Sequence, residues 1–248
     1  MTIPQGLHGY SSSQCCKLNK SLYGLKQASH QWFAKLSTLL LSFEYMQAHA
    51  DHNLFTKATG SSFTTLLVYV DDIVLASNSL DEIDHLKSSL HSHFHIRDLG
   101  KLKYFLGLEV AHSSTGLPLC QRKYCMDLIS DASLFNSKSS FTPMDPSLRL
   151  HHDSSAPLED PLPYRCLVGR LIYLTNKRPD IAFVTQQLSQ FRAAPTHCHF
   201  QAALRFVRYP KSCPGKGLFF SISSSLHLLC FSDDDWVTCV DTCRSTTS

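Results

Sequence analysis

The sequence predicts an α+β fold, with an antiparallel sheet and helices in the first part of the chain and a helical module after it. Apolar β-type runs at residues 64–68 and 73–76 lie on either side of a short polar stretch, which is typical of a β-hairpin. Residues 29–43 and 83–94 instead repeat their apolar side chains at helical spacing. Because 43% of the 248 residues are hydrophobic, a buried core is expected.

The first half of the chain contains two expected helices and a second hairpin. Residues 29–43 predict a core helix with one apolar stripe, formed by Trp32, Phe33, Leu36, Leu39, Leu40 and Phe43. A second helix should begin after Ser79, where Ser-Leu-Asp-Glu has the form of a capping box, and run to about Phe94. Residues 103–110 and 116–121 are expected to form the two arms of the further hairpin.

The second half is expected to contain a connector, a helical module and a final strand region. Residues 137–163 are rich in Ser, Pro and Asp and show no sustained period, which is typical of a long loop. Three helices are expected to follow, one that begins at Tyr164 and two at residues 180–191 and 197–209. Two strands are then expected at residues 217–220 and 226–231.

Asp71 and Asp72 are the most informative residues, because they are adjacent carboxylates at the tip of the hairpin expected at residues 64–76. Like charges at short range repel and lose solvation unless a cation lies between them. Carboxylate oxygens suit magnesium or manganese. The alternative is a solvated turn that binds no ligand. The flanking apolar strands favour metal binding without excluding that alternative.

Charge and cysteine usage narrow the class of protein only moderately. A net charge of +3 permits nucleic-acid binding through local patches but does not argue for it. The sequence has no apolar run as long as a membrane span and no secretory signal at its start, so a cytoplasmic or nuclear protein that is not secreted is expected. The 10 cysteines are scattered without paired zinc-ligand spacing, which indicates a reducing compartment.

Four motifs follow one another along the chain, at residues 17–32, 69–72, 98–110 and 164–175. Together they resemble the reverse transcriptase region of copia-type LTR retrotransposon Pol polyproteins, and the resemblance covers nearly the whole chain. It implies an RNA-directed DNA polymerase of a transposable element, which extends a primer by two-metal nucleotidyl transfer. The implied cofactor is Mg²⁺ or Mn²⁺, and the implied partners are template–primer nucleic acid and deoxynucleotides.

The resemblance also gives each expected segment a place in such a polymerase. Residues 1–136 would be a partial palm with a remnant of the fingers, and residues 137–163 a connector. Residues 164–213 would form a helical thumb-like module, and residues 214–248 the truncated start of a ribonuclease H-like domain.

In the palm of these enzymes, a Tyr-Val-Asp-Asp-type hairpin carries metal-binding carboxylates, and Asp71 and Asp72 match those positions. The residues that match nucleotide- and template-contacting positions are Tyr69, Gly24, Lys26 and Gln27. For residues 21–27 the alternative is a plain turn that leads into the following helix. His30 stands where the family commonly has arginine, which removes one candidate phosphate contact.

A primer grip and a thumb are implied further along the chain. Phe105, Leu106 and Gly107 match the primer grip, although their apolar side chains also fit a core role. Cations of the thumb-like helices that match phosphate contacts are Arg165, Arg170, Lys177, Arg178, Arg205 and Arg208. The alternative for these cations is a solubilising surface role. Pro210 stands where relatives usually have leucine, and it should end the last helix early.

Two departures from the family pattern bear on activity. The third carboxylate of the polymerase site would precede Met1, and Asp233, which matches the first ribonuclease H metal ligand, has no accompanying ligands before Ser248. We therefore expect no polymerisation by this chain alone. The alternative function is that of an inactive remnant that binds nucleic acid weakly. The sequence does not indicate an oligomeric state.

Overall fold

A computed structural model of the chain forms two compact units, residues 1–100 and 101–248, and each is described by itself. The architecture is α+β, with antiparallel sheets and helices, as predicted. No helix among the described residues is long and apolar enough to cross a membrane. The described residues are 14–15, 17–19, 22, 24–25, 27–70, 72–152, 155–225, 227, 229–231, 234–235 and 246–247.

The first unit contains a four-stranded antiparallel sheet in the order β1-β2-β3-β4. The strands are β1 (Met46–Gln47), β2 (Leu54–Thr59), β3 (Ser62–Tyr69) and β4 (Asp72–Ser77). The hairpin predicted around residues 69–72 is confirmed, because β3 pairs with β4 from Thr64↔Ser77 to Tyr69↔Asp72. Strand β2, with the segment Leu-Phe-Thr-Lys-Ala-Thr, was not predicted, since its alternation is weak.

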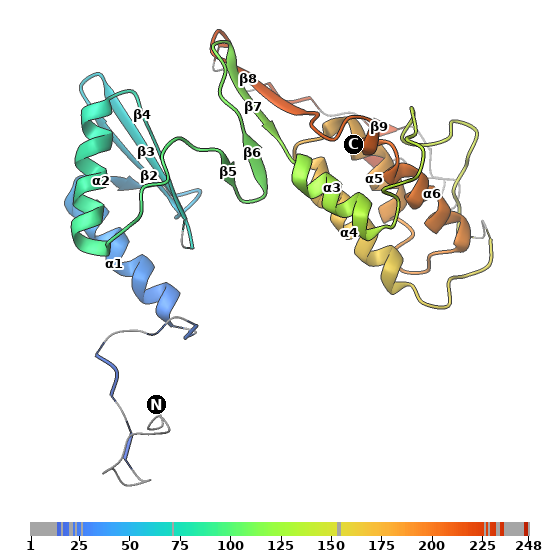
Figure 1. Ribbon diagram of the computed structural model, residues 1–248, viewed down its shortest axis with the longest axis horizontal. Helices are drawn as coiled ribbons and strands as arrows, with labels where there is room; N and C mark the ends of the chain where they lie inside the picture. The colour runs from blue at the N-terminus through green and yellow to red at the C-terminus, as the bar shows by residue number, and fades with distance from the viewer. Residues whose placement is uncertain are drawn as a thin grey trace. The chain divides into compact units, whose positions relative to one another are not determined.

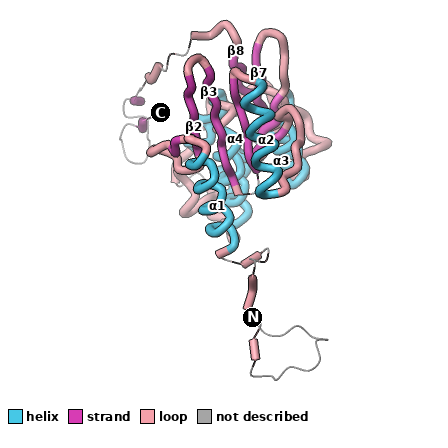
Figure 2. The backbone as a smooth tube through the Cα atoms, turned by 90° about the vertical axis from the view of Figure 1, so that its left-hand side faces the viewer, coloured by secondary structure: helices cyan, strands magenta, loops and turns pink. Residues whose placement is uncertain are grey.

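Both predicted helices of this unit are confirmed, as α1 (Ala28–Ser42) and α2 (Leu80–Phe94). They cover one face of the sheet (Figures 1 and 2). Alternate β3 residues are buried beneath them, as a period of two requires. The shared core consists of Leu36, Leu40, Tyr45, Phe55, Leu66, Val68, Leu86 and Leu90.

Only half of the predicted capping box forms at the start of α2. The Ser79 hydroxyl oxygen accepts the Glu82 N–H at 3.4 Å. The Glu82 carboxylate does not return to Ser79, because it accepts the Tyr45 hydroxyl at 3.0 Å and pairs with Lys57 at 3.5 Å. Tertiary partners therefore outcompete the local one.

Substitution of the capping serine tests this half box. We expect Ser79→Ala to lower the free energy of unfolding of the first unit by about 1 kcal/mol, because one N–H at the helix start loses its acceptor. Urea unfolding, followed by far-ultraviolet circular dichroism, measures the change. Ser88→Ala is the control, since the exposed Ser88 hydroxyl only donates to the Asp84 carbonyl within the same helix. An equal loss in both variants would contradict the capping role.

The second unit contains a four-stranded antiparallel sheet in the order β5-β6-β7-β8. Its strands are β5 (Tyr104–Phe105), β6 (Leu108–Val110), β7 (Gly116–Cys120) and β8 (Gly217–Ser221). The prediction of one continuous arm at residues 103–110 is wrong, because a tight turn at Leu106 and Gly107 folds it into β5 and β6. Strand β8, nearly a hundred residues later, completes the sheet by pairing with β7.

Helices supply the core of this unit, and the three predicted after residue 163 are confirmed. The helices are α3 (Arg122–Asp131), α4 (Leu162–Thr175), η1 (Pro179–Ile181), α5 (Ala182–Ser189), α6 (His197–Val207) and η2 (Pro210–Ser212). Helix α6 ends before Pro210, as predicted. Helix α3 was missed because it is short and its N-cap residue, Gln121, makes no side-chain cap, while the Glu109 carboxylate, 14 residues away in the sequence, accepts the Lys123 N–H at 2.6 Å instead.

The remaining predicted segments differ in outcome. Residues 137–161 contain no helix or strand among those described, but the connector is not simply exposed, because Leu150 is buried in the helical core. The strand expected at residues 226–231 is absent from its described members. A separate two-stranded sheet consists of β9 (Asp234–Asp235) and β10 (Thr246–Thr247).

Candidate functional site

The β3–β4 connection is a tight turn at the end of a buried hairpin. Tyr69 pairs with Asp72, so only residues 70 and 71 lie between the strands. Val70 has φ +49, a left-handed conformation that is a genuine outlier for a β-branched side chain. Asp71 lies outside the described residues.

The turn is exposed although the strands that carry it are anchored in the core. Val68 is 1% exposed, whereas Tyr69 and Val70 are 48% and 60% exposed. Asp72 begins β4 and is also exposed, and its side chain forms no hydrogen bond or ion pair with another described residue. The buried side chains therefore fix the two strands, and the Asp72 carboxylate stays exposed, where a ligand could reach it.

Two other carboxylates of this unit, those of Asp51 and Glu82, have partners of their own. The described residues contain no group of three or more His, Cys, Asp or Glu side chains arranged to hold a metal ion. Asp51 lies toward the same end of the sheet, since the Val68 N–H donates to the Asn53 carbonyl, but its carboxylate accepts the Asn53 N–H at 2.9 Å. Glu82 lies at the opposite end, where burial and the Glu82 hydrogen bond raise the pKa of Tyr45.

Gly24 and Gln27 lie just before α1, while Lys26 is outside the described residues. Gly24 has φ +86, which favours glycine, and the Leu25 N–H donates to the Leu22 carbonyl in the turn around it. The ring of Phe33 near the start of α1 packs against Phe55, with centroids 6.3 Å apart. The start of α1 and the β3–β4 turn thus lie toward the same end of this unit (Figure 1).

In the second unit, the predicted primer-grip residues form the β5–β6 turn. Leu106 and Gly107 have φ +48 and φ +77. Two successive positive φ values are the signature of the tight turns that suit a twisted hairpin. Phe105 is half-buried, and Leu106 is 39% exposed. The turn therefore presents backbone and one apolar side chain to solvent.

Four of the five predicted thumb arginines have partners within the protein, and Arg178 is described below. Arg165 on α4 donates to the carbonyls of Arg192 and Ala193, at 2.8 and 2.9 Å. Arg170 pairs with Asp131 at 2.7 Å, and Arg205 on α6 donates to the Thr142 hydroxyl at 3.2 Å.

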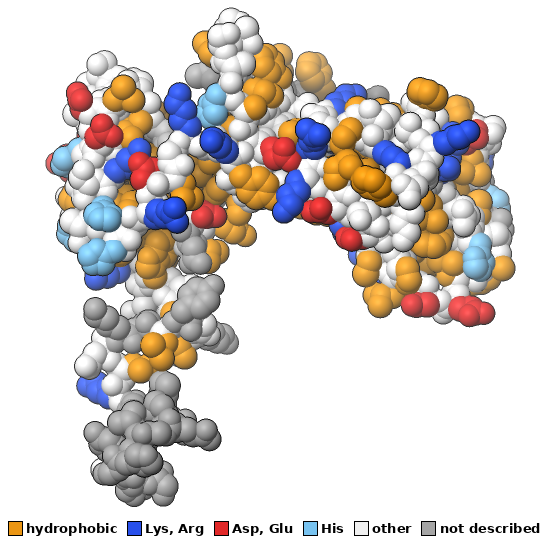
Figure 3. Space-filling model, in the orientation of Figure 1, with side chains coloured by type: hydrophobic (Ala, Val, Ile, Leu, Met, Phe, Trp, Pro, Cys, Tyr) orange, Lys and Arg blue, Asp and Glu red, His pale blue; other side chains and the backbone are white. Residues whose placement is uncertain are grey.

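Arg208 follows α6, and no hydrogen bond or ion pair joins its half-buried side chain to another described residue. On the face that Figure 3 displays, basic side chains alternate with acidic and apolar ones. A phosphate on this face would therefore meet separate cations. Four of the five predicted arginines are already hydrogen-bonded to protein atoms.

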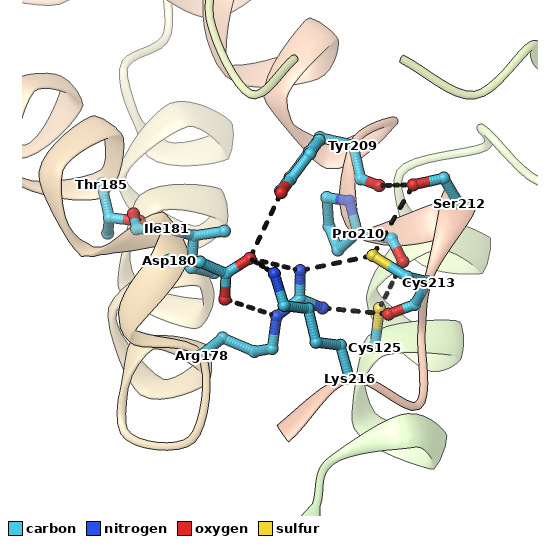
Figure 4. A network of polar contacts seen from close by, with 10 residues as sticks. All are labelled: Cys125, Arg178, Asp180, Ile181, Thr185, Tyr209, Pro210, Ser212, Cys213 and Lys216. Carbon is cyan, nitrogen blue, oxygen red and sulfur yellow. Dashed lines mark hydrogen bonds and ion pairs between the residues drawn. The ribbon is translucent and has the colours of Figure 1, made fainter. Parts of the chain in front are cut away.

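Arg178 does not fit its predicted role as a phosphate contact, because it is only 1% exposed. Its guanidinium binds Asp180 through two hydrogen bonds of 2.8 and 3.0 Å and donates to the Cys213 carbonyl at 3.1 Å (Figure 4). Lys216 and the Tyr209 hydroxyl also contact the Asp180 carboxylate, at 3.1 and 3.3 Å. This network, hereafter the Arg178 network, joins η1 to the segment after α6.

The pKa values in the Arg178 network follow from these contacts. Hydrogen bonding from Arg178 lowers the pKa of Asp180 to about 2, with a smaller contribution from Lys216. Burial raises the pKa of the neighbouring Cys125 thiol to about 11. A thiol of this kind is inert at neutral pH, so the network has a structural character.

The last site residue and one unpredicted cap complete the description of the second unit. Asp233, the predicted ribonuclease H-like metal ligand, lies outside the described residues. Sequence reasoning also missed the buried capping box before α6, in which the Thr196 N–H donates to His199 Nδ1 at 3.0 Å. A histidine in the place of the usual Glu or Gln concealed that signal.

Comparisons with known proteins agree on one family. Residues 1–146 match the family described as reverse transcriptase (RNA-dependent DNA polymerase). The chain is 40% identical over 221 residues to the retrovirus-related Pol polyprotein from transposon RE1 of Arabidopsis thaliana. The matched residues make up 89% of this chain and 15% of that polyprotein. No solved structure matches.

Two shorter relatives match over most of their own length. An uncharacterized mitochondrial protein of Arabidopsis thaliana is 38% identical over 73% of this chain and 75% of its own. A putative transposon Ty5-1 protein of Saccharomyces cerevisiae is 31% identical over 88% of this chain and 71% of its own length.

The family match covers more than half of the chain, including the whole first unit. By contrast, the chain spans 15% of the length of the transposon RE1 and RE2 polyproteins. The hairpin motif, the family match and the transposon relatives agree, and the chain belongs to the reverse transcriptase family of copia-type retrotransposon Pol polyproteins.

Proposed function

We propose that this chain forms the palm hairpin and thumb-like helices of an RNA-directed DNA polymerase, with Asp71 and Asp72 as metal-binding carboxylates. The observation that carries the proposal is the left-handed Val70 in the turn before them. Such a conformation costs free energy, and strained residues of this kind cluster at functional sites. A plain solvated turn would favour Gly, Asn or Asp there.

The chemistry of Asp72 fits a divalent cation. Its carboxylate is exposed, carries no described protein partner and lies on a strand pair anchored by Leu66 and Val68. Oxygen ligands of this type suit Mg²⁺ and Mn²⁺. When bound, such a cation supplies positive charge to the oxygens of an in-line displacement. The chain's own contribution is a hairpin anchored in the core that leaves the Asp72 carboxylate exposed.

Nucleic acid and deoxynucleotides are the proposed ligands. Gly24 and Gln27 lie toward the same end of the first unit as Asp72, which supports a shared nucleotide-contacting surface. In the second unit, the β5–β6 turn supports a primer-grip role, and Arg208 is a cation whose side chain makes no hydrogen bond or ion pair with another described residue, so it could meet a phosphate. Arg165, Arg170 and Arg205 would share any phosphate contact with their present partners.

Template–primer binding without nucleotide addition is the second candidate function. It is favoured by the state of a second carboxylate toward that end of the sheet. Asp51, the other exposed carboxylate toward that end of the first unit, accepts a hydrogen bond from its own turn. The two candidates share the hairpin and differ only in whether a primer is extended.

Removal of the Asp72 charge tests the metal site. We expect Asp72→Asn to weaken Mn²⁺ binding at least about tenfold, because a neutral amide replaces a carboxylate ligand. Electron paramagnetic resonance of free Mn²⁺ measures the affinity. Asp51→Asn is the matched control and should bind Mn²⁺ as the unmodified protein does. Unchanged binding in Asp72→Asn would overturn the assignment.

Primer extension then separates the two candidate functions. The purified chain is mixed with an RNA template, a labelled DNA primer, deoxynucleotides and Mg²⁺. Extension that disappears in Asp72→Asn and persists in Asp51→Asn supports the polymerase. Metal-dependent binding of the template–primer without extension supports the second candidate, and a chain that binds neither metal nor template–primer contradicts both.

A further inference from the structure

The β5–β6 turn is held by more than its own strands. Strands β5 and β6 have two and three residues, and only Tyr104↔Glu109 and Phe105↔Leu108 pair between them. Strand β6 also pairs with β7 and the Val110 N–H donates to the Lys103 carbonyl, but β5 is the edge strand and is paired on one side only. The hairpin also places Leu106, a residue with a Cβ, at φ +48. A contact from outside the hairpin would therefore stabilise the turn in this conformation.

Tyr173 on α4 provides that contact. Its hydroxyl donates to the Leu106 carbonyl at 2.8 Å, across 67 residues of sequence. A Cβ built on Gly107 would lie 2.8 Å from the same hydroxyl oxygen, closer than real Cβ atoms come. The missing side chain of Gly107 is thus what admits the tyrosine, and the two residues form one contact.

Tyr173 is itself fixed by helix α3. Its ring packs edge-on against Tyr124, with centroids 4.8 Å apart. The Tyr124 hydroxyl donates to the Arg170 carbonyl at 3.1 Å, and the Arg170 guanidinium lies 5.7 Å from the centre of the Tyr124 ring. The Arg170–Asp131 pair then closes the link between α3 and α4.

Burial does not account for Tyr173. Its side chain is 38% exposed and is not a member of the helical core. A phenylalanine would keep the packing against Tyr124, so the hydroxyl has one described role, the bond to Leu106. This polar contact joins the thumb-like helices to the turn.

We propose that Tyr173 is the positioning residue of the β5–β6 turn and fixes the Leu106–Gly107 backbone where a recessed primer 3′ end would meet it. The inference rests on the proposed primer-grip function of this turn. Tyr173 does not touch the reacting atoms. It acts through Leu106, so its loss should affect recognition of the primer end without affecting general attraction to a duplex.

The first measurement concerns the turn alone. Hydrogen–deuterium exchange of peptides that cover residues 104–110 should become faster in Tyr173→Phe. Tyr124→Phe is the matched control, because it removes a hydroxyl from the same ring pair and leaves the Leu106 contact in place. Equal exchange in Tyr173→Phe and the unmodified protein would overturn the proposal, whatever the protein binds.

The second measurement concerns the primer end. Fluorescence anisotropy should show about fivefold weaker binding of a template–primer with a recessed 3′ end in Tyr173→Phe, the effect of one lost hydrogen bond. Binding of a blunt duplex of equal length should not change, whereas a merely structural defect would weaken both. If the unmodified protein binds neither duplex, the proposed function is contradicted. The exchange measurement then still tests whether Tyr173 holds the β5–β6 turn.

A second variant reaches the same contact from the turn. Gly107→Ala places a Cβ against the Tyr173 hydroxyl at a strained φ, so it should also accelerate exchange at residues 104–110. Gly60→Ala is its control, since Gly60 also has positive φ but nothing lies within 4 Å of its Cβ position. Slow exchange at residues 104–110 in Gly107→Ala would overturn the proposal even if Tyr173→Phe were too unstable to purify.

Discussion

Arg178→Met is expected to destabilise the second unit by about 3 kcal/mol, because the charge-assisted hydrogen bonds of a buried guanidinium are lost and the Asp180 carboxylate keeps only Lys216 and Tyr209 as partners. Arg178 is 1% exposed and makes two hydrogen bonds to Asp180. Its loss also leaves the Cys213 carbonyl without this donor. The change in the free energy of unfolding is measured by hydrogen–deuterium exchange of peptides from α4, α5 and α6 at increasing urea concentrations, in the variant and in the unmodified protein.

Lys177→Met is the matched control for this prediction. It removes the same formal charge from the neighbouring position, where the side chain is half-buried and forms no ion pair with a described residue. Its expected effect is within about 0.5 kcal/mol. Peptides from α1 and α2 serve as an internal reference, because they belong to the other unit. A loss of similar size in both variants would contradict the role of the Arg178 network.

The Arg178 network also gives stability a definite pH dependence. Arg178 lowers the pKa of Asp180 to about 2, below its ordinary value of 3.8. A lowered carboxyl pKa stabilises the folded state above the ordinary value, and this contribution is lost as pH falls from 3.8 toward 2. Asp180→Asn should therefore show a shallower acid dependence of its unfolding free energy than the unmodified protein.

Phe55 is a large, fully buried side chain in the core of the first unit. This side chain is fully buried between the sheet and α1, where it packs against Phe33. We expect Phe55→Ala to lower the free energy of unfolding of the first unit by about 3–5 kcal/mol, since it removes a large buried side chain and leaves a cavity. Urea unfolding monitored by Trp32 fluorescence reports the change, because Trp32 packs against Phe94 in the same unit.

Phe63→Ala provides the control on the adjacent strand. Phe63 lies on β3 and is 51% exposed, so its removal opens no cavity, and its effect should stay within about 0.5 kcal/mol. Phe55→Ala should also weaken Mn²⁺ binding at Asp72 under mildly denaturing conditions, as the strands that hold the turn open. A chain that unfolds at the same urea concentration in both variants would contradict the central place of Phe55.

The elements predicted correctly are those with strong local patterns. The stripe of α1, the Ser79 start of α2 and the paired apolar runs around the β3–β4 turn each carry their signal within a few residues. Strand β2 and helix α3 were missed because each is short and neither has a clear period or cap. The split of residues 103–110 into β5 and β6 was missed because a distant side chain fixes it.

The candidate site divides in the same way. The sequence indicated Asp71 and Asp72 through their position between apolar runs, and the motifs around them indicated the family. The left-handed conformation of Val70 and the exposure of the Asp72 carboxylate could be seen only in the folded hairpin. The sequence could not show which arginines of the helical module form ion pairs within the protein and which are exposed to solvent, because both kinds are the same residue type.

The sequence by itself determined the α+β class, the order of the principal helices, the reverse transcriptase ancestry and the hairpin that carries the aspartate pair, because each follows from short-range patterns. Tertiary structure alone decided which polar groups meet. Arg178 meets Cys213 across 35 residues, and Tyr173 meets Leu106 across 67. Such contacts depend on how helices and strands pack around a core, and spacing along the chain does not encode that packing.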